Sequence, residues 1–169
     1  YNKMKFEGIT NLNARVKDIF AKDKEISGYI HIPDFTINDE KYGAVYIDVT
    51  KNVNNPYKAN IAIGDFLAIK GAYNEKTKMV DSKIKLREAP LQLLQYLLKD
   101  GIKNTKGYID ADITFGGPTN ALNIDGDGSI HKGSTTLIYT GATYYFDKQR
   151  VKLSNQKIMA IVGSDDDKY

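Results

Sequence analysis

The sequence contains no cysteine and no tryptophan. Without cysteine, the protein cannot be a disulfide scaffold, hold a thiolate zinc site or use a cysteine nucleophile. Long apolar runs are missing as well. The most apolar stretch, Leu91–Leu98, is far shorter than the roughly 20 residues that a membrane-spanning helix needs.

Arginine is scarce. Only Arg15, Arg87 and Arg150 occur among 24 basic residues, and 21 acidic residues are interspersed with them, so the net charge is only +3. Proteins that bind nucleic acids usually gather positive charge on one face and use arginine for bidentate contacts with bases. The composition therefore argues against DNA or RNA binding, and it favours lysines on solvated strand edges and outer faces.

The length of 169 residues, with 41% hydrophobic residues, suits a single domain with a sizeable core. The chain begins at Tyr1 in mid-pattern, with no starting methionine and no signal peptide, so we expect a piece of a longer protein or a processed chain. We expect residues 1–163 to form one β segment. The acidic tail, 164–169, is expected to be disordered because it has no apolar partner.

Apolar and polar residues alternate along most of the chain, which places every second side chain on one face of a strand. In the clearest run, Ile109, Ala111, Ile113 and Phe115 alternate with polar residues. Clusters of turn-forming residues separate the runs, at 38–40, 52–56, 74–76, 116–118, 147–149 and 154–156. The pattern predicts a mainly β fold, an antiparallel meander of about ten short strands.

One segment departs from this alternation. Its leucines recur at a helical spacing, at Leu91, Leu94, Leu97 and Leu98. Pro90 stands at its first turn and Gly101 just beyond its end, which predicts one short helix over about 90–100. We expect the leucine stripe to pack against the sheet as a plug, because only Lys99 offers the basic contact that a membrane-surface helix would need.

A sheet that is apolar on one face cannot simply lie open in water. A sandwich or a barrel would hide that face completely. A curved, gutter-shaped sheet would leave an apolar trough across the strands. The alternation does not choose between these outcomes.

No group of titratable residues converges on a catalytic site. His31 and His131 each stand alone, so we interpret them as half-exposed strand residues. Asp110 and Asp112 share a strand face, but the alternation directs both into water. Ser134 and its neighbours have no histidine that spacing would implicate. We therefore expect no enzyme activity, no cofactor and no metal site.

The run from Asn123 to Ile130 imitates a calcium-binding loop, with oxygen-bearing side chains at alternate positions and glycine for a sharp turn. However, Asn123 replaces the usual first aspartate, and Ser134 replaces the usual bidentate glutamate at the twelfth position. The flanks also have the pattern of strands rather than helices. A strand followed by a glycine-rich turn is the better interpretation, and calcium binding is the weaker alternative. No phosphate-binding glycine loop is present.

The order of elements over residues 90–160 is distinctive. The proline- and leucine-rich helix leads through Gly101 to an alternating strand, Gly107–Phe115, and then to Gly116-Gly117-Pro118. A second strand follows, then the segment Thr136–Phe146 with its glycine and tyrosines, and finally Arg150–Leu153. This arrangement resembles the C-terminal domain of the TamB translocation and assembly module family, within the AsmA-like group. Residues 1–88 match it only in style.

The resemblance implies a β-taco, an elongated antiparallel sheet curled into a U with an apolar inner face. It also implies a segment of a bridge that crosses the periplasm of a Gram-negative bacterium and is anchored in the inner membrane in the full-length protein. Such a bridge would carry phospholipid, or another lipid with acyl chains, toward the outer membrane and support outer-membrane biogenesis. Its expected partners are the rest of a longer TamB-like chain and an outer-membrane barrel of the TamA type.

A trough of this kind would shelter acyl chains, with a gain of about 0.8 kcal/mol for each buried methylene. The residues predicted to line the lipid groove are the apolar members of the alternating runs: Val45, Ile47, Val49, Ile61, Ile63, Leu67, Ile69, Ile84, Leu86, Ile109, Ile113, Phe115, Leu122, Ile124, Leu137, Tyr139, Tyr144, Phe146, Val151 and Leu153. For each of them, ordinary core packing is the competing interpretation.

Two other functions stay open. The first is a chaperone-like scaffold for outer-membrane protein assembly, which would offer sheet edges to unfolded strands by β-augmentation. The second is a calcium- or carbohydrate-binding surface domain, suggested by the 12 tyrosines and the calcium-like run. That second function predicts a closed sandwich without a groove.

Overall fold

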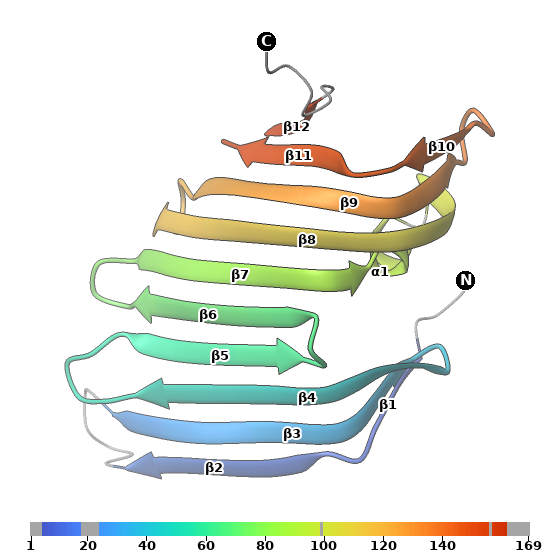
Figure 1. Ribbon diagram of the computed structural model, residues 1–169. Helices are drawn as coiled ribbons and strands as arrows, with labels where there is room; N and C mark the ends of the chain where they lie inside the picture. The colour runs from blue at the N-terminus through green and yellow to red at the C-terminus, as the bar shows by residue number, and fades with distance from the viewer. Residues whose placement is uncertain (1–4, 18–23, 99, 156, 162–169) are drawn as a thin grey trace. The chain divides into compact units, whose positions relative to one another are not determined.

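The computed structural model describes residues 5–17, 24–98, 100–155 and 157–161. Within these residues, twelve strands form one antiparallel sheet that is not closed, together with one short helix (Figure 1). The predicted mainly β, antiparallel meander with a single short helix is therefore confirmed. The predicted tail, 164–169, lies outside the described residues.

The strands follow one another nearly in chain order, β1-β3-β4-β5-β6-β7-β8-β9-β11-β12, with β2 also beside β3 and β10 also beside β9. Their bounds, and those of the helix, are β1 (Phe6–Glu7), β2 (Asn11–Lys17), β3 (Glu25–Ile37), β4 (Glu40–Lys51), β5 (Tyr57–Ile63), β6 (Leu67–Asn74), β7 (Met79–Pro90), α1 (Gln92–Leu97), β8 (Ile102–Pro118), β9 (Asn123–Leu137), β10 (Thr143–Phe146), β11 (Gln149–Ser154) and β12 (Lys157–Ile161). The chain separates into two compact units, residues 1–85 with 114–123 and residues 86–113 with 124–169.

In the first unit, a two-residue turn joins β3 to β4. Asn38 and Asp39 adopt φ values of 50° and 68°, which asparagine and aspartate tolerate better than most residues. The pairing of β3 with β4 shifts register between Ile32 and Thr36, and beyond this irregularity the strands from β3 to β6 pair without a further shift. Ile47 lies opposite Ile61, and Ile61 lies opposite Ile69. A slip of one residue would move every apolar side chain of a strand to the other face, so the alternation itself stabilises this register.

In the second unit, hydrogen bonds join the helix and the residue before it to β8. The Leu91 N–H donates to the carbonyl of Gly107 (2.9 Å), and the Thr105 N–H donates to the Gln95 side chain (3.0 Å). Gly107 has φ +104°, and a β-carbon there would lie 2.6 Å from the Cα of Gly133. Only glycine fits at this close approach of two backbones.

The helix is shorter than predicted and packs differently. It spans six residues, and Pro90, expected at its first turn, is the last residue of β7. Leu91 is only 3% exposed, whereas Leu94 and Leu98 are 38% and 54% exposed. The prediction that the leucine stripe packs against the sheet is therefore correct for Leu91 and wrong for Leu94 and Leu98. A helix of less than two turns buries only a narrow strip. The side chain of Leu97 lies outside the described residues.

Two predicted boundaries were wrong, and several strands were not predicted. The expected turn at 116–118 is the end of β8, which continues to Pro118, and the chain turns at 119–122 instead. Leu137 ends β9, so the expected strand does not continue to Tyr139. The pattern also gave no explicit prediction of β2, β3 or β12. In β3, Gly28 and Pro33 interrupt an otherwise alternating run.

Candidate functional site

One face of the first unit carries a continuous set of apolar side chains on β3 to β6. Residues that pair directly across antiparallel strands share a face, so the register arranges them in rows across the strands. The central row is Ile30, Ile47, Ile61 and Ile69, and the next row is Ile32, Val45, Ile63 and Leu67. These eight residues together with Val49 are called the apolar ladder. Seven of the nine were predicted from the sequence, and the structure brings those seven together.

The ladder is half-buried rather than buried. Val45 is 5% exposed, while the other ladder residues fall in the intermediate range of exposure. Among the described residues, no side chain is less than 2% exposed. This degree of burial is expected where side chains contact neighbours in their own layer.

Polar and aromatic groups bound the ladder at one end. Lys51 follows Val49 on the same face and is 6% exposed, and its ammonium donates to the carbonyl of Lys24 (3.1 Å). The same ammonium lies 5.5 Å from the ring centroid of Tyr57, whose ring stacks with that of Tyr73 at 6.3 Å. The apolar surface of these strands therefore ends at Lys51, Tyr57 and Tyr73, whose side chains can interact with polar groups.

Most of the other residues predicted to line a groove are half-buried on strands. Ile84 and Phe115 belong to the first unit, as does Leu122, which lies just before β9. In the second unit the half-buried members are Leu86, Ile109, Ile113, Ile124, Leu137, Phe146, Val151 and Leu153. There Val151 and Leu153 lie opposite Gly128 and Gly126 of β9.

Two of the predicted lining residues are placed differently. Tyr139 lies in the turn after β9 and is 99% exposed, so its side chain does not lie in a row of the sheet. Tyr144 lies on β10 but is 48% exposed. The alternation around these tyrosines continues through the connection between β9 and β10, and for this reason the sequence pattern placed Tyr139 on a strand.

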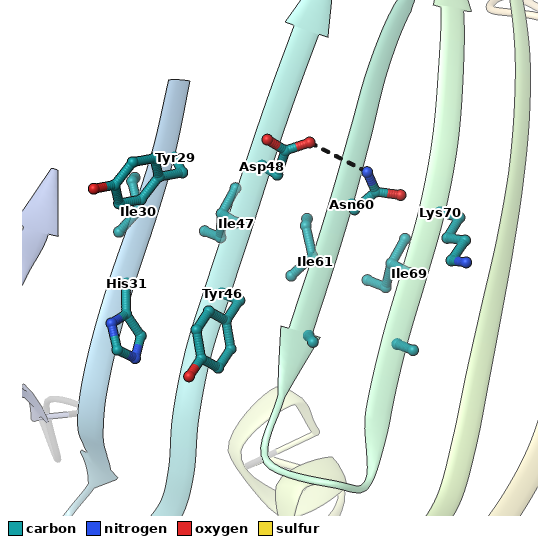
Figure 2. A pocket seen from close by; sticks show the side chains of 12 residues that line it. Tyr29, Ile30, His31, Tyr46, Ile47, Asp48, Asn60, Ile61, Ile69 and Lys70 are labelled. Carbon is teal, nitrogen blue, oxygen red and sulfur yellow. Dashed lines mark hydrogen bonds between the residues drawn. The ribbon is translucent and has the colours of Figure 1, made fainter. Parts of the chain in front are cut away.

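The opposite face of β3 to β6 holds a shallow hollow of about 340 Å³ (Figure 2). Two rows of side chains border it. The first row is Tyr29, Asp48, Asn60 and Lys70, and the second is His31, Tyr46, Ala62 and Ala68. The central isoleucines of the apolar ladder lie between these rows along each strand, so their backbone forms the floor while their side chains alternate to the other face. These eight bordering residues are called the tyrosine groove.

The groove contains two defined contacts. The rings of His31 and Tyr46, which are direct partners across β3 and β4, stack at 4.3 Å with an interplanar angle of 11°. The amide of Asn60 donates to the carboxylate of Asp48 at 3.3 Å. The sequence pattern predicts His31 as an isolated residue, and this prediction is wrong. Its cross-strand partner depends on the register of β3, which the sequence pattern did not give.

A polar cluster in the second unit includes the other histidine. Nε2 of His131 lies 2.8 Å from the carboxylate of Asp110 and 2.8 Å from the hydroxyl of Ser129. The interpretation of His131 as a solitary residue was therefore wrong. The three residue types are those of a hydrolytic triad, but the hydroxyl and the carboxylate contact the same ring nitrogen. A triad needs one contact on each nitrogen, so this geometry does not relay a proton.

The two aspartates on β8 have different partners. Asp112 accepts a bidentate ion pair from the guanidinium of Arg87 at 2.8 and 2.9 Å, with both side chains at least half exposed. Asp110 accepts from the backbone N–H of Glu88 at 2.8 Å. Glu88 has φ +46°, a left-handed conformation within β7. Asp110 therefore satisfies a backbone donor at an irregular point of the strand.

The calcium-like run is part of a strand. Asn123–Leu137 forms β9 without interruption, so the run does not form the loop that calcium coordination requires. Within the described ranges, no group of three or more His, Asp or Glu residues is placed to hold a metal ion. In the same ranges, no helix is long and apolar enough to cross a membrane.

Comparisons with known proteins find no relative: no family model matches the chain, and no curated protein or solved structure matches it significantly.

Proposed function

We propose that this chain is a lipid-shielding segment of a TamB-like envelope bridge, and that the apolar ladder contacts the acyl chains. The observation that supports the proposal is the register of β3 to β6, which lines up isoleucine, valine and leucine in rows across four strands. Neighbouring strands lie about 4.8 Å apart, so a row extends over about 14 Å. An acyl chain along such a row would leave water at a gain of about 0.8 kcal/mol for each methylene.

The second support is the resemblance of residues 90–160 to the TamB family. With it come the proposed setting and partners: the periplasm of a Gram-negative bacterium, an inner-membrane anchor in the full-length protein, and a TamA-type barrel. The curl of the sheet into a taco belongs to the same proposal. The lipid requires no bond chemistry from the protein, which accords with side chains that shelter rather than react.

A crosslinking experiment tests the lipid contact. A photoreactive phenylalanine analogue is placed at Ile69, on the ladder, or at Lys70, the next residue on the opposite face. After irradiation in bacterial cells that produce the chain, mass spectrometry of the purified protein measures attached phospholipid. We expect capture at Ile69 and little at Lys70, and the same contrast between Ile113 and Asp112 in the second unit. Equal capture from both positions of a pair would overturn the proposal.

A chaperone-like scaffold is the second candidate, and one observation favours it. All seven residues of β2 are exposed, and within the described residues β2 pairs only with β3. Its outer edge can therefore accept another strand by β-augmentation. Substitution of Ala14 by proline would block such pairing, because the Asn13 carbonyl faces β3 and the Ala14 N–H of the same peptide therefore points to the outer edge. Loss of client barrels from a pull-down with unchanged phospholipid capture at Ile69 would favour the scaffold over the lipid segment.

A further inference from the structure

The tyrosine groove lies on the face opposite the apolar ladder, and the proposed lipid contact does not use it. Its hollow exists because two alanines, Ala62 and Ala68, stand in register where the adjacent row carries Asn60 and Lys70. Small side chains beside longer ones leave a depression that runs across the strands. From β3 to β6 it spans about 14 Å.

Aromatic rings stand at one end of this depression. Tyr29 and Tyr46 are 51% and 53% exposed, and the ring of Tyr46 is held in place by its stack with His31. A half-exposed ring that is fixed on a strand offers an apolar face to a ligand at little cost in conformational entropy. The C–H face of a pyranose ring is a suitable partner for such a surface, because it is apolar while its edge carries hydroxyl groups.

Polar groups follow the tyrosines along the same row. Asp48, Asn60 and Lys70 stand side by side on β4, β5 and β6. A carboxylate accepts more than one hydrogen bond, an amide both donates and accepts, and an ammonium donates. This mixture matches the hydroxyl groups of a sugar. Asp48 and Lys70 carry opposite formal charges, so the row favours a neutral ligand over a strongly anionic one.

We propose that the tyrosine groove is a binding site for a neutral oligosaccharide chain, in which sugar rings stack on Tyr46 and Tyr29 and their hydroxyl groups bond to Asp48 and Asn60. The length of the groove accommodates two or three rings of an extended chain. The proposal is independent of the lipid function, because the two surfaces lie on opposite faces of the same strands. Neither outcome of the crosslinking test at Ile69 bears on the sugar site, so the two proposals can fail separately.

Isothermal titration of the full chain with defined sugars tests the site. The probes are cellohexaose and the hexamer of N-acetylglucosamine, both neutral, with hexagalacturonate as the anionic comparison. We expect at least one neutral hexamer to bind, and hexagalacturonate to bind more weakly. Absence of binding by both neutral hexamers, or tighter binding of hexagalacturonate, would overturn the proposal.

Two variants locate the binding. Tyr46→Ala removes the stacking platform, and Ala68→Gln fills the hollow with a neutral side chain. Each should weaken binding by about tenfold. The matched controls are Tyr145→Ala, which removes a tyrosine that is 82% exposed on β10, and Ala72→Gln, on the same strand and face as Ala68 but outside the groove.

Both controls should bind like the unaltered chain. Circular dichroism and thermal melting check that each variant is folded. If Tyr46→Ala is unfolded at the temperature of the titration, the binding of Ala68→Gln alone tests the site. Unchanged binding by a folded Ala68→Gln variant, or equal weakening by Ala72→Gln, would show that the sugar binds elsewhere.

Discussion

Asp110 holds the backbone of Glu88 in place. Its carboxylate accepts the Glu88 N–H at 2.8 Å, at a residue whose φ of +46° takes it out of the regular strand conformation. His131 contacts the other carboxylate oxygen at 2.8 Å. One side chain thus joins an irregular point of β7 to β9, while its neighbour two residues away, Asp112, makes only an exposed ion pair.

This difference predicts unequal effects of two similar substitutions. Asp110→Ala leaves a backbone donor without its acceptor and should lower the free energy of unfolding by about 1–3 kcal/mol. Asp112→Ala removes an exposed ion pair and should cost less than about 1 kcal/mol. Urea unfolding of both variants measures the two losses. Equal losses would show that the Asp110–Glu88 contact contributes little.

The leucines around the helix give a second pair. Leu91 is 3% exposed, and its side chain adjoins the position of Gly133. Leu91→Ala should lower the unfolding free energy by about 2–5 kcal/mol, as expected for a buried leucine. Leu94→Ala, at a position that is 38% exposed, should cost clearly less. Thermal melting of the two variants side by side checks the contrast, and a larger effect at Leu94 would contradict the observed packing.

The two faces of β4 should separate the two proposed ligands. Ile47→Val removes one methylene from the ladder, so phospholipid capture from the probe at Ile69 should fall by about fourfold. Binding of the neutral hexasaccharide should be unchanged. Tyr46→Ala should have the opposite pattern. If either variant reduced both ligands equally while remaining folded, the faces would not act separately.

Calcium should have no effect on stability. Asp125 and Asp127 lie on a continuous strand, where residues two apart are separated by about 6.8 Å and cannot surround one ion by themselves. Addition of millimolar calcium should leave the melting temperature of the chain unchanged. A rise that disappears in the Asp125→Asn variant would restore the calcium site that the sequence run suggested.

Much of the fold could be predicted because alternation is a local property. The runs around Ile47, Ile61 and Ile113 each lie on an observed strand, since a period of two is the spacing that puts successive side chains on opposite faces. The same rule failed at Tyr139, where alternation continues into a turn. A different rule failed at Pro118: residues 116–118 are typical of turns, yet β8 extends through them.

The candidate sites show the same difference between features set by chain neighbours and features set by strand pairing. The sequence identified Val45, Ile47, Ile61 and Ile69 as members of an apolar face, because each can be recognised from its own neighbours in the chain. It treated His31 and His131 as isolated, because the residues beside them come from other strands: Tyr46 for one, Asp110 for the other.

By itself, then, the sequence determined that most of β4 to β11 would be strands, which side of those strands is apolar, and that cysteine chemistry is excluded. The tertiary structure decided which strands pair and in what register. Only that register aligns the isoleucines in a row, stacks His31 on Tyr46 and sets Asp110 against the Glu88 N–H. The physical reason is that side-chain direction follows from a few neighbouring residues, whereas pairing depends on the combined packing and hydrogen bonding of segments far apart in the chain.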